Sequence, residues 1–304
     1  MVCLDNIMQQ PPHVTVIIST YNRADWLVKA IHTVLAQSYQ DFELVIVDDA
    51  STDNTAVRMA EFGEAVRYIR LPQHLGQPES VKNHGIAAAK GSLIALLDDD
   101  DTWRSDKLAQ QVAVFNKRPE VGFVYTDFCF VYEDGSHSAA LLSPHHLEAE
   151  RAFDHLLENC FIHPSTAVFR RTVYDRLAPL GILPILDDYY FLLRATHATV
   201  AACIAEPLVA IRRHQGSISN QRGIQNYEAL VVLLEHLLSH LQLNSRQRFL
   251  SRRALARTHT HIGLHQLQEG QIKQARRHFN QSLRANPLQR RAWLALGESF
   301  FARL

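Results

Sequence analysis

Short apolar runs alternate with amphipathic stretches over the first two hundred residues of this chain. Four runs rich in Val, Ile and Leu have the length and composition of buried strands: residues 14–19, 43–47, 66–70 and 93–97. Between them apolar residues recur at helical spacing, as Leu27, Ile31 and Val34 do within residues 24–37. Strands that alternate with helices in this way predict an α/β fold with a mostly parallel, Rossmann-like sheet flanked by helices.

Capping residues and glycines mark where these elements begin and end. Asn22 is predicted to cap the helix that begins at Ala24, and Gly91 to end the helix that follows the loop at 73–78. Further helices are predicted over residues 105–117 and 187–197. Further strands are predicted over residues 123–132, 165–169, 200–204 and 208–211.

Beyond Gly223 the hydrophobic pattern is helical throughout and contains a repeat. The tetratricopeptide pattern has a period of 34 residues. Its small and aromatic positions match Gly263, Ala275 and Phe279, and a second repeat starts at Trp293. We therefore predict two domains, residues 1–222 and an all-α segment at 223–304. One and a half repeats cannot form a free-standing solenoid, so this segment must pack on the body or on a partner.

Composition places the chain among ordinary globular proteins, with 47% apolar and 20% charged residues. The four widely spaced cysteines fit free thiols in a reducing cytoplasm better than a disulfide framework or a zinc site. No stretch has the length of a membrane-spanning helix, and the polar start lacks the apolar core of a signal peptide. These features predict a cytoplasmic protein.

The charge is unevenly distributed although the formal net charge is zero. Residues 243–304 contain twelve Lys or Arg and two Asp or Glu, so the remainder of the chain carries a net charge of −10. The basic segment could dock on the acidic body, or it could face an anionic partner such as the inner face of a membrane, a lipid phosphate or a protein. We favour the anionic partner because the incomplete repeat must also bury an apolar face.

Carboxylates follow two of the predicted strands. Four of them stand in a row at residues 98–101, directly after the run at 93–97, and Asp48 and Asp49 follow the run at 43–47. Adjacent carboxylates repel one another, and Mg²⁺ or Mn²⁺ would offset that charge with oxygen ligands. Ligands of open α/β sheets bind beyond the carboxyl ends of the strands. No glycine-rich dinucleotide fingerprint follows any strand, which argues against a dehydrogenase.

Five segments in order resemble the family-2 glycosyltransferases, which have the GT-A fold. The segments are residues 14–23, 43–51, 85–103, 187–194 and 212–219, within a region of similarity at about 13–220. The resemblance implies a nucleotide-sugar transferase with a Mn²⁺ or Mg²⁺ cofactor and no nucleic-acid partner. By family habit the donor is a uridine diphosphate sugar. A polysaccharide, a lipid-linked glycan or a protein could be the acceptor.

The resemblance also implies roles for individual residues. Thr20 and Tyr21 would flank the nucleotide base, and Asp49 would accept a hydrogen bond from it. Asp98 and Asp99 would lie near the ribose and the water shell of the metal. The following residues complete the donor-binding set: Asn22, Arg23 and Lys82. Lys82 stands where the family often has Arg, and it cannot bind in bidentate fashion.

The resemblance further implies a metal ligand and a catalytic base. Asp100 matches the last acid of the family's DxD motif and would bind the metal directly. Asp188 would be the base, and Asp187 stands where the family usually has Glu. Arg212 and His214 would approach the diphosphate or the acceptor, as would Asp187. The role of Asp188 implies transfer with inversion, because one base acts on the acceptor opposite the leaving group.

Two other functions remain open from the sequence. The protein could be an inactive nucleotide-sugar-binding scaffold that acts through its helical segment, or a metal-dependent nucleotidyltransferase. The acids at Asp49, Asp100 and Asp188 favour the glycosyltransferase. No glycine-rich triphosphate-binding loop supports the nucleotidyltransferase.

Overall fold

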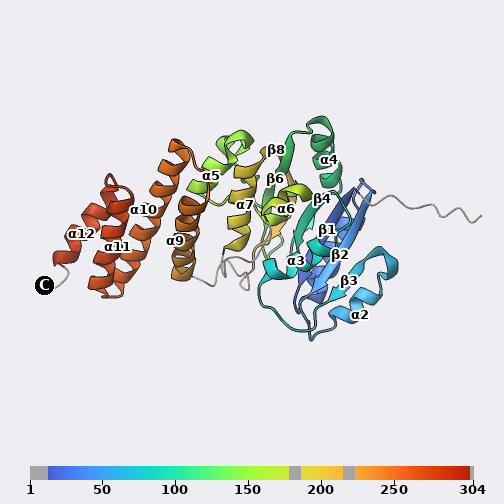
Figure 1. Ribbon diagram of the computed structural model, residues 1–304. Helices are drawn as coiled ribbons and strands as arrows, with labels where there is room; N and C mark the ends of the chain where they lie inside the picture. Colours follow the sequence, from blue (N-terminus) through green and yellow to red (C-terminus); the bar gives the residue numbers. More distant parts are fainter. Residues whose placement is uncertain (1–12, 178–185, 215–222, 302–304) are drawn as a thin grey trace, which may run out of the picture. The chain divides into compact units, whose positions relative to one another are not determined.

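The computed structural model describes residues 13–177, 186–214 and 223–301, which divide into two compact units (Figure 1). The first unit contains residues 13–150, 162–177 and 194–213. The second contains residues 151–161, 186–193, His214 and 223–301. The helices beyond Gly223 therefore belong to the same unit as residues 151–161 and 186–193. The predicted domain boundary at residue 222 places these two segments in the first domain.

Eight strands of the described chain form one sheet in the order β3-β2-β1-β4-β7-β6-β8-β5. Their bounds are β1 Val14–Thr20, β2 Phe42–Asp48, β3 Arg67–Arg70, β4 Leu93–Asp98, β5 Thr102–Trp103, β6 Val121–Val131, β7 Val168–Arg170 and β8 Val200–Arg212. Neighbouring strands from β3 to β4 are parallel, as are β6 and β8. Strand β7 runs antiparallel to both β4 and β6, and β5 runs antiparallel to β8. This confirms the predicted mostly parallel α/β sheet.

The register of the parallel strands brings three polar loops to one edge of the sheet. Strand β1 lies between β2 and β4, where Thr20 pairs with Asp48 and Ser19 pairs with Asp98. The three strands therefore end at the same level, and the loops that follow them are neighbours. Along their length the strands are buried and apolar, which fixes this register.

Helices connect these strands and cover the sheet. Helix α1 buries Leu27, Ile31 and Val34 against it, as the helical spacing predicts, and α3 packs against β1 and β2. The helical bounds of this unit are α1 Ala24–Leu35, α2 Thr55–Ala60, η1 Gly63–Ala65, α3 Pro78–Ala88, α4 Lys107–Lys117, η2 Pro144–Leu147, η4 Pro164–Thr166 and α6 Arg171–Leu177. A short turn, η3 Ala149–Arg151, follows η2.

Two predicted helix boundaries are wrong. Asn22 does not cap α1, because its backbone has a φ of +53° and Arg23 occupies the cap position. The amide of Ala24 instead donates to the carboxylate of Asp53, 3.2 Å away. Gly91 does not end α3 in a left-handed conformation. A side chain there would lie 2.5 Å from the backbone nitrogen of Thr15, so close packing requires the glycine.

Two predicted strand boundaries also differ. Residues 164–166 form the turn η4 and not the start of a strand, because Pro164 favours a helical turn and the hydroxyl of Thr166 donates back to the carbonyl of His163 at 2.7 Å. The two strands predicted at 200–204 and 208–211 are one strand, β8. Its register against β6 shifts around Pro207, which lacks an amide hydrogen for the ladder.

The second unit is helical in its described residues. It contains α5 Ala152–Glu158, the start of α7 Asp187–Ala198, α9 Gly223–His240, α10 Ser245–Gln268, α11 Ile272–Ala285 and α12 Arg290–Phe301. Helix α10 packs against α5, α9 and α11, and α12 packs on α11. This confirms the predicted helical segment. Within the described part of the chain, no helix combines the length and hydropathy that crossing a bilayer requires.

Arginines of α10 bind α5 within this unit. Arg246 forms an ion pair with Asp154 at 2.7 Å. Arg257 donates to the carbonyl of Glu158 at 2.9 Å, and Arg253 lies 3.8 Å from the carboxylate of Glu158. Part of the basic charge is therefore used inside the helical unit.

The tetratricopeptide pattern corresponds to a close packing contact between α10 and α11. Ala275 and Phe279 are fully buried, and the ring of Phe279 lies against Gly263. A Cβ atom added to Gly263 would lie 2.5 Å from this ring. Gly297 occupies the matching position in α12, one period later, and a Cβ atom there would meet nothing within 4 Å.

These two glycines provide a matched test of the repeat. We expect Gly263→Ala to destabilise the protein by about 1–3 kcal/mol, because the buried ring of Phe279 has little room to move. Gly297→Ala should be neutral or slightly stabilising, since alanine in a helix is more favourable than glycine by up to about 1 kcal/mol. Urea denaturation followed by circular dichroism measures both. Equal effects of the two substitutions would contradict this packing.

Candidate active site

The acidic run (residues 98–101) begins where β4 ends, and its members contact different segments of the first unit. Lys82 of α3 places its Nζ 2.8 Å from Oδ1 of Asp98. Thr20, the last residue of β1, donates its hydroxyl to Asp99 at 2.7 Å. Neighbours on both sides of the acidic run therefore offset part of its charge.

Arg23 is shared by the two middle carboxylates. Its Nη1 lies 3.0 Å from Oδ1 of Asp99 and 3.1 Å from Oδ2 of Asp100. Partial burial opposes ionisation of the guanidinium, but the charges of Asp99 and Asp100 prevail and raise the pKa of Arg23. The ring of Trp26 lies beneath it, 5.5 Å from the guanidinium carbon. Arg23 thus provides a fixed positive charge beside the predicted metal ligand.

Asp101 is buried and contacts the interior of the unit. Its Oδ2 accepts a hydrogen bond from the hydroxyl of Ser165 at 2.6 Å, and its Oδ1 accepts one from the amide of Arg212 at 3.1 Å. Burial and the nearby charges of Asp98 and Asp100 raise the pKa of this carboxyl well above its ordinary value. Asp101 therefore connects the acidic run to η4 and to the end of β8.

The remaining carboxylates differ in exposure and in pKa. Burial, together with the charge of Asp100, raises the pKa of Asp99 to about 6 despite the opposing charge of Arg23. Burial also acts upward on Asp98, but Lys82 holds the pKa of this carboxyl below its ordinary value. The side chains of Asp98 and Asp100 are 36% and 17% exposed, whereas that of Asp99 is 7% exposed. Asp98 and Asp100 are thus the more accessible oxygen donors.

Asp49 binds the loop that leads to α3. Its oxygens accept hydrogen bonds from the backbone amides of Leu75 at 2.7 Å and Gly76 at 3.0 Å. The imidazole of His74 lies 2.8 Å from the same carboxylate and stacks on the ring of Tyr21, with 3.8 Å between centroids. A carboxylate accepts about four hydrogen bonds, so Asp49 retains some capacity for a ligand. Asp49 does not cap α2.

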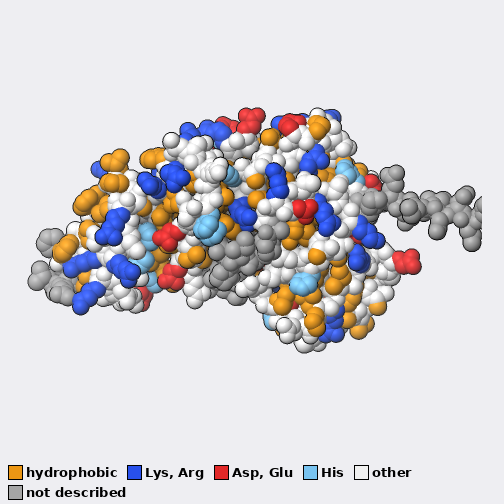
Figure 2. Space-filling view, viewed as in Figure 1, with side chains coloured by type: hydrophobic (Ala, Val, Ile, Leu, Met, Phe, Trp, Pro, Cys, Tyr) orange, Lys and Arg blue, Asp and Glu red, His pale blue; other side chains and the backbone are white. Residues whose placement is uncertain are grey.

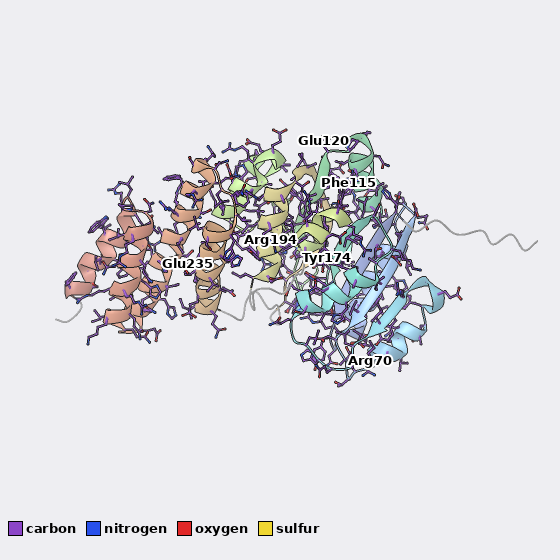
Figure 3. All side chains as sticks on the ribbon, in the orientation of Figure 1. Arg70, Phe115, Glu120, Tyr174, Arg194 and Glu235 are labelled. Carbon is purple, nitrogen blue, oxygen red and sulfur yellow. The ribbon has the colours of Figure 1, made fainter. Side chains whose placement is uncertain are left out.

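Asn22 joins the loop after β1 to the loop after β2. Its side-chain oxygen accepts hydrogen bonds from the amides of Thr52 at 2.7 Å and Asp53 at 3.2 Å. Arg70, which is labelled in Figure 3, lies at the end of β3. It donates to the carbonyl of Ser51 at 2.7 Å. These bonds hold the loops at the sheet edge in a defined arrangement.

Arg212 ends β8 and lies beside the ring of Trp26, as Arg23 does. The guanidinium carbons of Arg212 and Arg23 lie 5.9 and 5.5 Å from the ring centroid of Trp26. Arg212 is also anchored to Asp101 through its backbone. The structure thus brings the following predicted residues into one region of the first unit: Thr20, Arg23, Lys82, Asp98, Asp99, Asp100 and Arg212.

Asp187, Asp188 and His214 belong to the second unit. Asp187 is buried and Asp188 is half-buried at the N-terminus of α7, just after Leu186, whose φ is +61°. Oδ1 of Asp188 accepts a hydrogen bond from the amide of Tyr189 at 2.7 Å. The hydroxyl of Tyr189 donates to the carbonyl of Leu156 in α5, which helps to fix the start of α7. Residues 215–219 of the similar segment lie outside the described residues.

A known protein family matches the part of the chain that contains the acidic run. The family model for glycosyl transferase family 2 matches residues 15–178, more than half of the chain. The chain belongs to glycosyl transferase family 2. The match contains β1–β4, the acidic run and Ser165, and it ends before α7. This is the family that the five segments of the sequence resemble.

Individual relatives and solved structures agree with this family. The chain is 28% identical over 179 residues to the Escherichia coli UDP-Glc:alpha-D-GlcNAc-diphosphoundecaprenol beta-1,3-glucosyltransferase WfgD, which covers 58% of this chain and 67% of WfgD. It spans 53% to 67% of the length of three curated relatives. The fold matches Staphylococcus aureus TarS with UDP-GlcNAc, with a TM-score of 0.69, 17% identity and coverage of 95% of this chain and 87% of TarS.

A second structure carries a metal. The mannosyltransferase PcManGT of Pyrobaculum calidifontis, in complex with GDP-Man and Mn²⁺, matches with a TM-score of 0.63 and 20% identity over 97% of this chain and 82% of that chain. At these identities both structures support the GT-A fold and not the details of the site. The predicted fold class is thereby confirmed.

The carboxylate oxygens of the acidic run fit a divalent metal that also binds phosphate oxygens of a substrate. Among the described residues, no three His, Cys, Asp or Glu side chains converge as a complete metal cage. Mg²⁺ in phosphate-transfer sites is held by one or two carboxylates together with substrate phosphates. Asp100, with Asp98 two residues away in the chain, provides such a partial set of oxygen donors.

Sequence reasoning missed three residues that shape this site. Ser165 and Asp101 bond to one another, and His74 stacks on Tyr21. Asp101 stood in the sequence only as the fourth acid of a row, and no pattern showed that it is buried. Ser165 follows a His-Pro pair that marks a turn, but its contact is 64 residues away in the chain. Only the folded sheet brings the two together.

Proposed function

We propose that this protein is an inverting, metal-dependent glycosyltransferase that moves a sugar from a nucleotide diphosphate to an acceptor hydroxyl. The observation that carries the proposal is the acidic run at the end of β4, bordered by Lys82, Arg23 and Thr20. It combines partly exposed oxygen donors for a metal with fixed cations for a diphosphate. These are the groups that a departing nucleotide diphosphate needs.

The donor would bind along the edge where β1, β2 and β4 end. Tyr21 and Thr20 would contact the base, and Asp49 would use its remaining acceptor capacity for a base N–H. Asn22 holds the loops that frame this position, and Asp98 and Asp99 would face the ribose. A uridine diphosphate sugar is the proposed donor, since TarS is known with UDP-GlcNAc and WfgD is named for UDP-Glc.

Asp100 would hold Mn²⁺ or Mg²⁺, with Asp98 near its water shell. When bound, the metal would neutralise the charge that develops on the diphosphate. Lys82, Arg23 and Arg212 would supply further positive charge around that group. Their positions within the first unit are held by ion pairs and by stacking on Trp26, so little reorganisation is needed during the reaction.

Asp188 would act as the general base. It would take the proton of the acceptor hydroxyl while that oxygen bonds to the anomeric carbon and the bond from this carbon to the diphosphate breaks. Displacement from the opposite side inverts the anomeric configuration. His214 and Asp187 would orient the acceptor or the diphosphate. The acceptor class proposed here is a growing polysaccharide or a lipid-linked glycan, in keeping with the diphosphoundecaprenol in the name of WfgD.

The basic helices would hold the enzyme at the inner face of a membrane. Helix α11 contains Lys273, Arg277 and Arg284 on one exposed face and has no Asp or Glu. Lys and Arg side chains are spread over the visible face of α10–α12 (Figure 2). Each basic residue near an anionic membrane contributes about 1 kcal/mol to binding. The arginines that bind α5 would not contribute.

The metal assignment predicts the effect of Asp100→Asn. We expect this substitution to leave the fold intact and to reduce transfer by at least about 10²-fold, because the diphosphate charge is no longer offset. Activity of the native enzyme should disappear with a chelator and return with Mn²⁺. A panel of nucleotide sugars, assayed for hydrolysis and transfer with Mn²⁺, measures the activity of each variant and separates a transferase from an inactive scaffold.

Asp175→Asn on α6 is the control for an equal change of charge. Full turnover in chelator would refute the metal role.

The assignment of the base predicts a separate effect for Asp188→Asn. Turnover should fall by about 10²–10⁴-fold, which is typical of a lost general base. Affinity for the donor should hardly change, since Asp188 acts on the acceptor. Steady-state kinetics together with calorimetric titration of UDP distinguishes the two quantities. Loss of donor affinity with catalysis retained would show that Asp188 is a donor ligand.

The membrane assignment predicts binding to anionic vesicles that weakens with salt. Co-sedimentation with phosphatidylglycerol vesicles at 50 and about 500 mM NaCl measures it. The triple variant Lys273→Gln, Arg277→Gln, Arg284→Gln should bind less than the native protein. Its control carries the same loss of charge on the first unit, at Lys29, Lys90 and Lys117. Absence of binding at low salt would mean that the basic helices serve packing alone.

A further inference from the structure

One buried serine side chain contacts the acidic run on both sides of Asp100. Ser165 lies in η4 and is fully buried. Its Oγ donates a hydrogen bond to Oδ2 of Asp101 at 2.6 Å and accepts one from the backbone amide of Asp98 at 3.1 Å. The two contacts bracket Asp100 in the chain, so they constrain the backbone that carries the proposed metal ligand.

The backbone of Ser165 makes a third contact with the same segment. Its carbonyl accepts a hydrogen bond from Nε1 of Trp103 at 2.9 Å, and Trp103 is itself buried. Nζ of Lys107 lies 3.9 Å from the centroid of that indole ring. Ser165 is thus bonded at Asp98, Asp101 and Trp103, which spans the loop from the end of β4 to β5.

The turn that carries Ser165 is held firmly. Thr166, its neighbour, is also fully buried, and its hydroxyl bonds to the carbonyl of His163. The carbonyl of Thr166 accepts a hydrogen bond from Nε2 of Gln111 at 3.0 Å, from α4. Ser165 therefore has little freedom to move with the acidic run, and the run must conform to the position of the serine.

We propose that Ser165 is a positioning residue for the metal ligand Asp100, and this rests on the metal-dependent function proposed above. Mutual repulsion of the four carboxylates favours a loop that spreads apart. The hydroxyl of Ser165 opposes this by fixing Asp101 in the interior and the amide of Asp98 at the strand end. Asp100 is then held between two anchored residues, with Oδ2 at 3.1 Å from Nη1 of Arg23 and its side chain 17% exposed. Partners that orient a metal ligand typically change metal affinity or activity by about 10–100-fold when removed.

Direct measurement of Mn²⁺ binding tests this inference without relying on turnover. Electron paramagnetic resonance of free Mn²⁺, in the presence of UDP, gives the dissociation constant for each full-length variant. We expect Ser165→Ala to bind Mn²⁺ about 10–100-fold more weakly, with a similar fall in kcat. Thr166→Val is the matched control, because it removes a buried hydroxyl from the same turn that does not bond to the acidic run. It should retain the native affinity for Mn²⁺ even if its melting temperature falls.

Further variants separate positioning from simple loss of stability. Ser165→Thr keeps the hydroxyl and should recover most of the Mn²⁺ affinity. Ser165→Cys has nearly the shape of serine, but its thiol is only a weak donor and acceptor. It takes the place of Ser165→Ala if the alanine variant does not fold, and it should show the weakened Mn²⁺ binding that is expected of alanine. Native Mn²⁺ affinity in a folded Ser165→Ala or Ser165→Cys protein overturns the inference, as does an equal loss in Thr166→Val. Native affinity in Asp100→Asn overturns the metal assignment itself, and the role of Ser165 with it.

Discussion

Repulsion among four consecutive carboxylates is the constraint on which the first unit depends. Four adjacent negative charges at the end of a buried strand destabilise the folded state unless other groups offset them. In this protein the offsetting groups come from four segments that are distant in sequence: Thr20 and Arg23 near β1, Lys82 in α3, Ser165 in η4 and the amide of Arg212 in β8. The contacts that stabilise the acidic run are therefore also the contacts that assemble the site.

The surrounding loops are joined to one another as well as to the sheet. Asp49 binds the backbone of residues 75 and 76, His74 stacks on Tyr21, and Asn22 binds the loop after β2. Loops of this kind usually vary in conformation, because they lack the regular bonds of helices and strands. Here hydrogen bonds from backbone amides to the side-chain oxygens of Asp49 and Asn22 replace those bonds. A donor would meet a site whose shape is already largely formed, which reduces the free energy spent on ordering it.

In the helical unit, packing contacts and surface charge lie on different helices and faces. Helix α10 uses Arg246 and Arg257 to bind α5, and Gly263 allows Phe279 of α11 to pack closely. Helix α12 presents the same repeat position, Gly297, without a side chain over it. An incomplete repeat can thus be stable because α5 and α9 cover α10 in place of further repeats. Three cations of α11, Lys273, Arg277 and Arg284, are left at the surface.

The sequence by itself determined the α/β class, the four parallel strands β1 to β4, the helical segment and the family, because hydrophobic periodicity and local motifs are properties of short stretches. It also singled out the acidic run. It did not predict the short strand β5, and it divided β8 into two strands. Only the tertiary structure decided that Asp99 and Asp101 are the buried ones, since the four acids are chemically identical until β1, η4 and β8 pack around them. The roles of Asn22 and Gly91 were misjudged for the same reason: each is set by contacts with Thr52 or Thr15, which lie far away in the chain. Local propensity cannot report a contact whose partner is defined only by the fold.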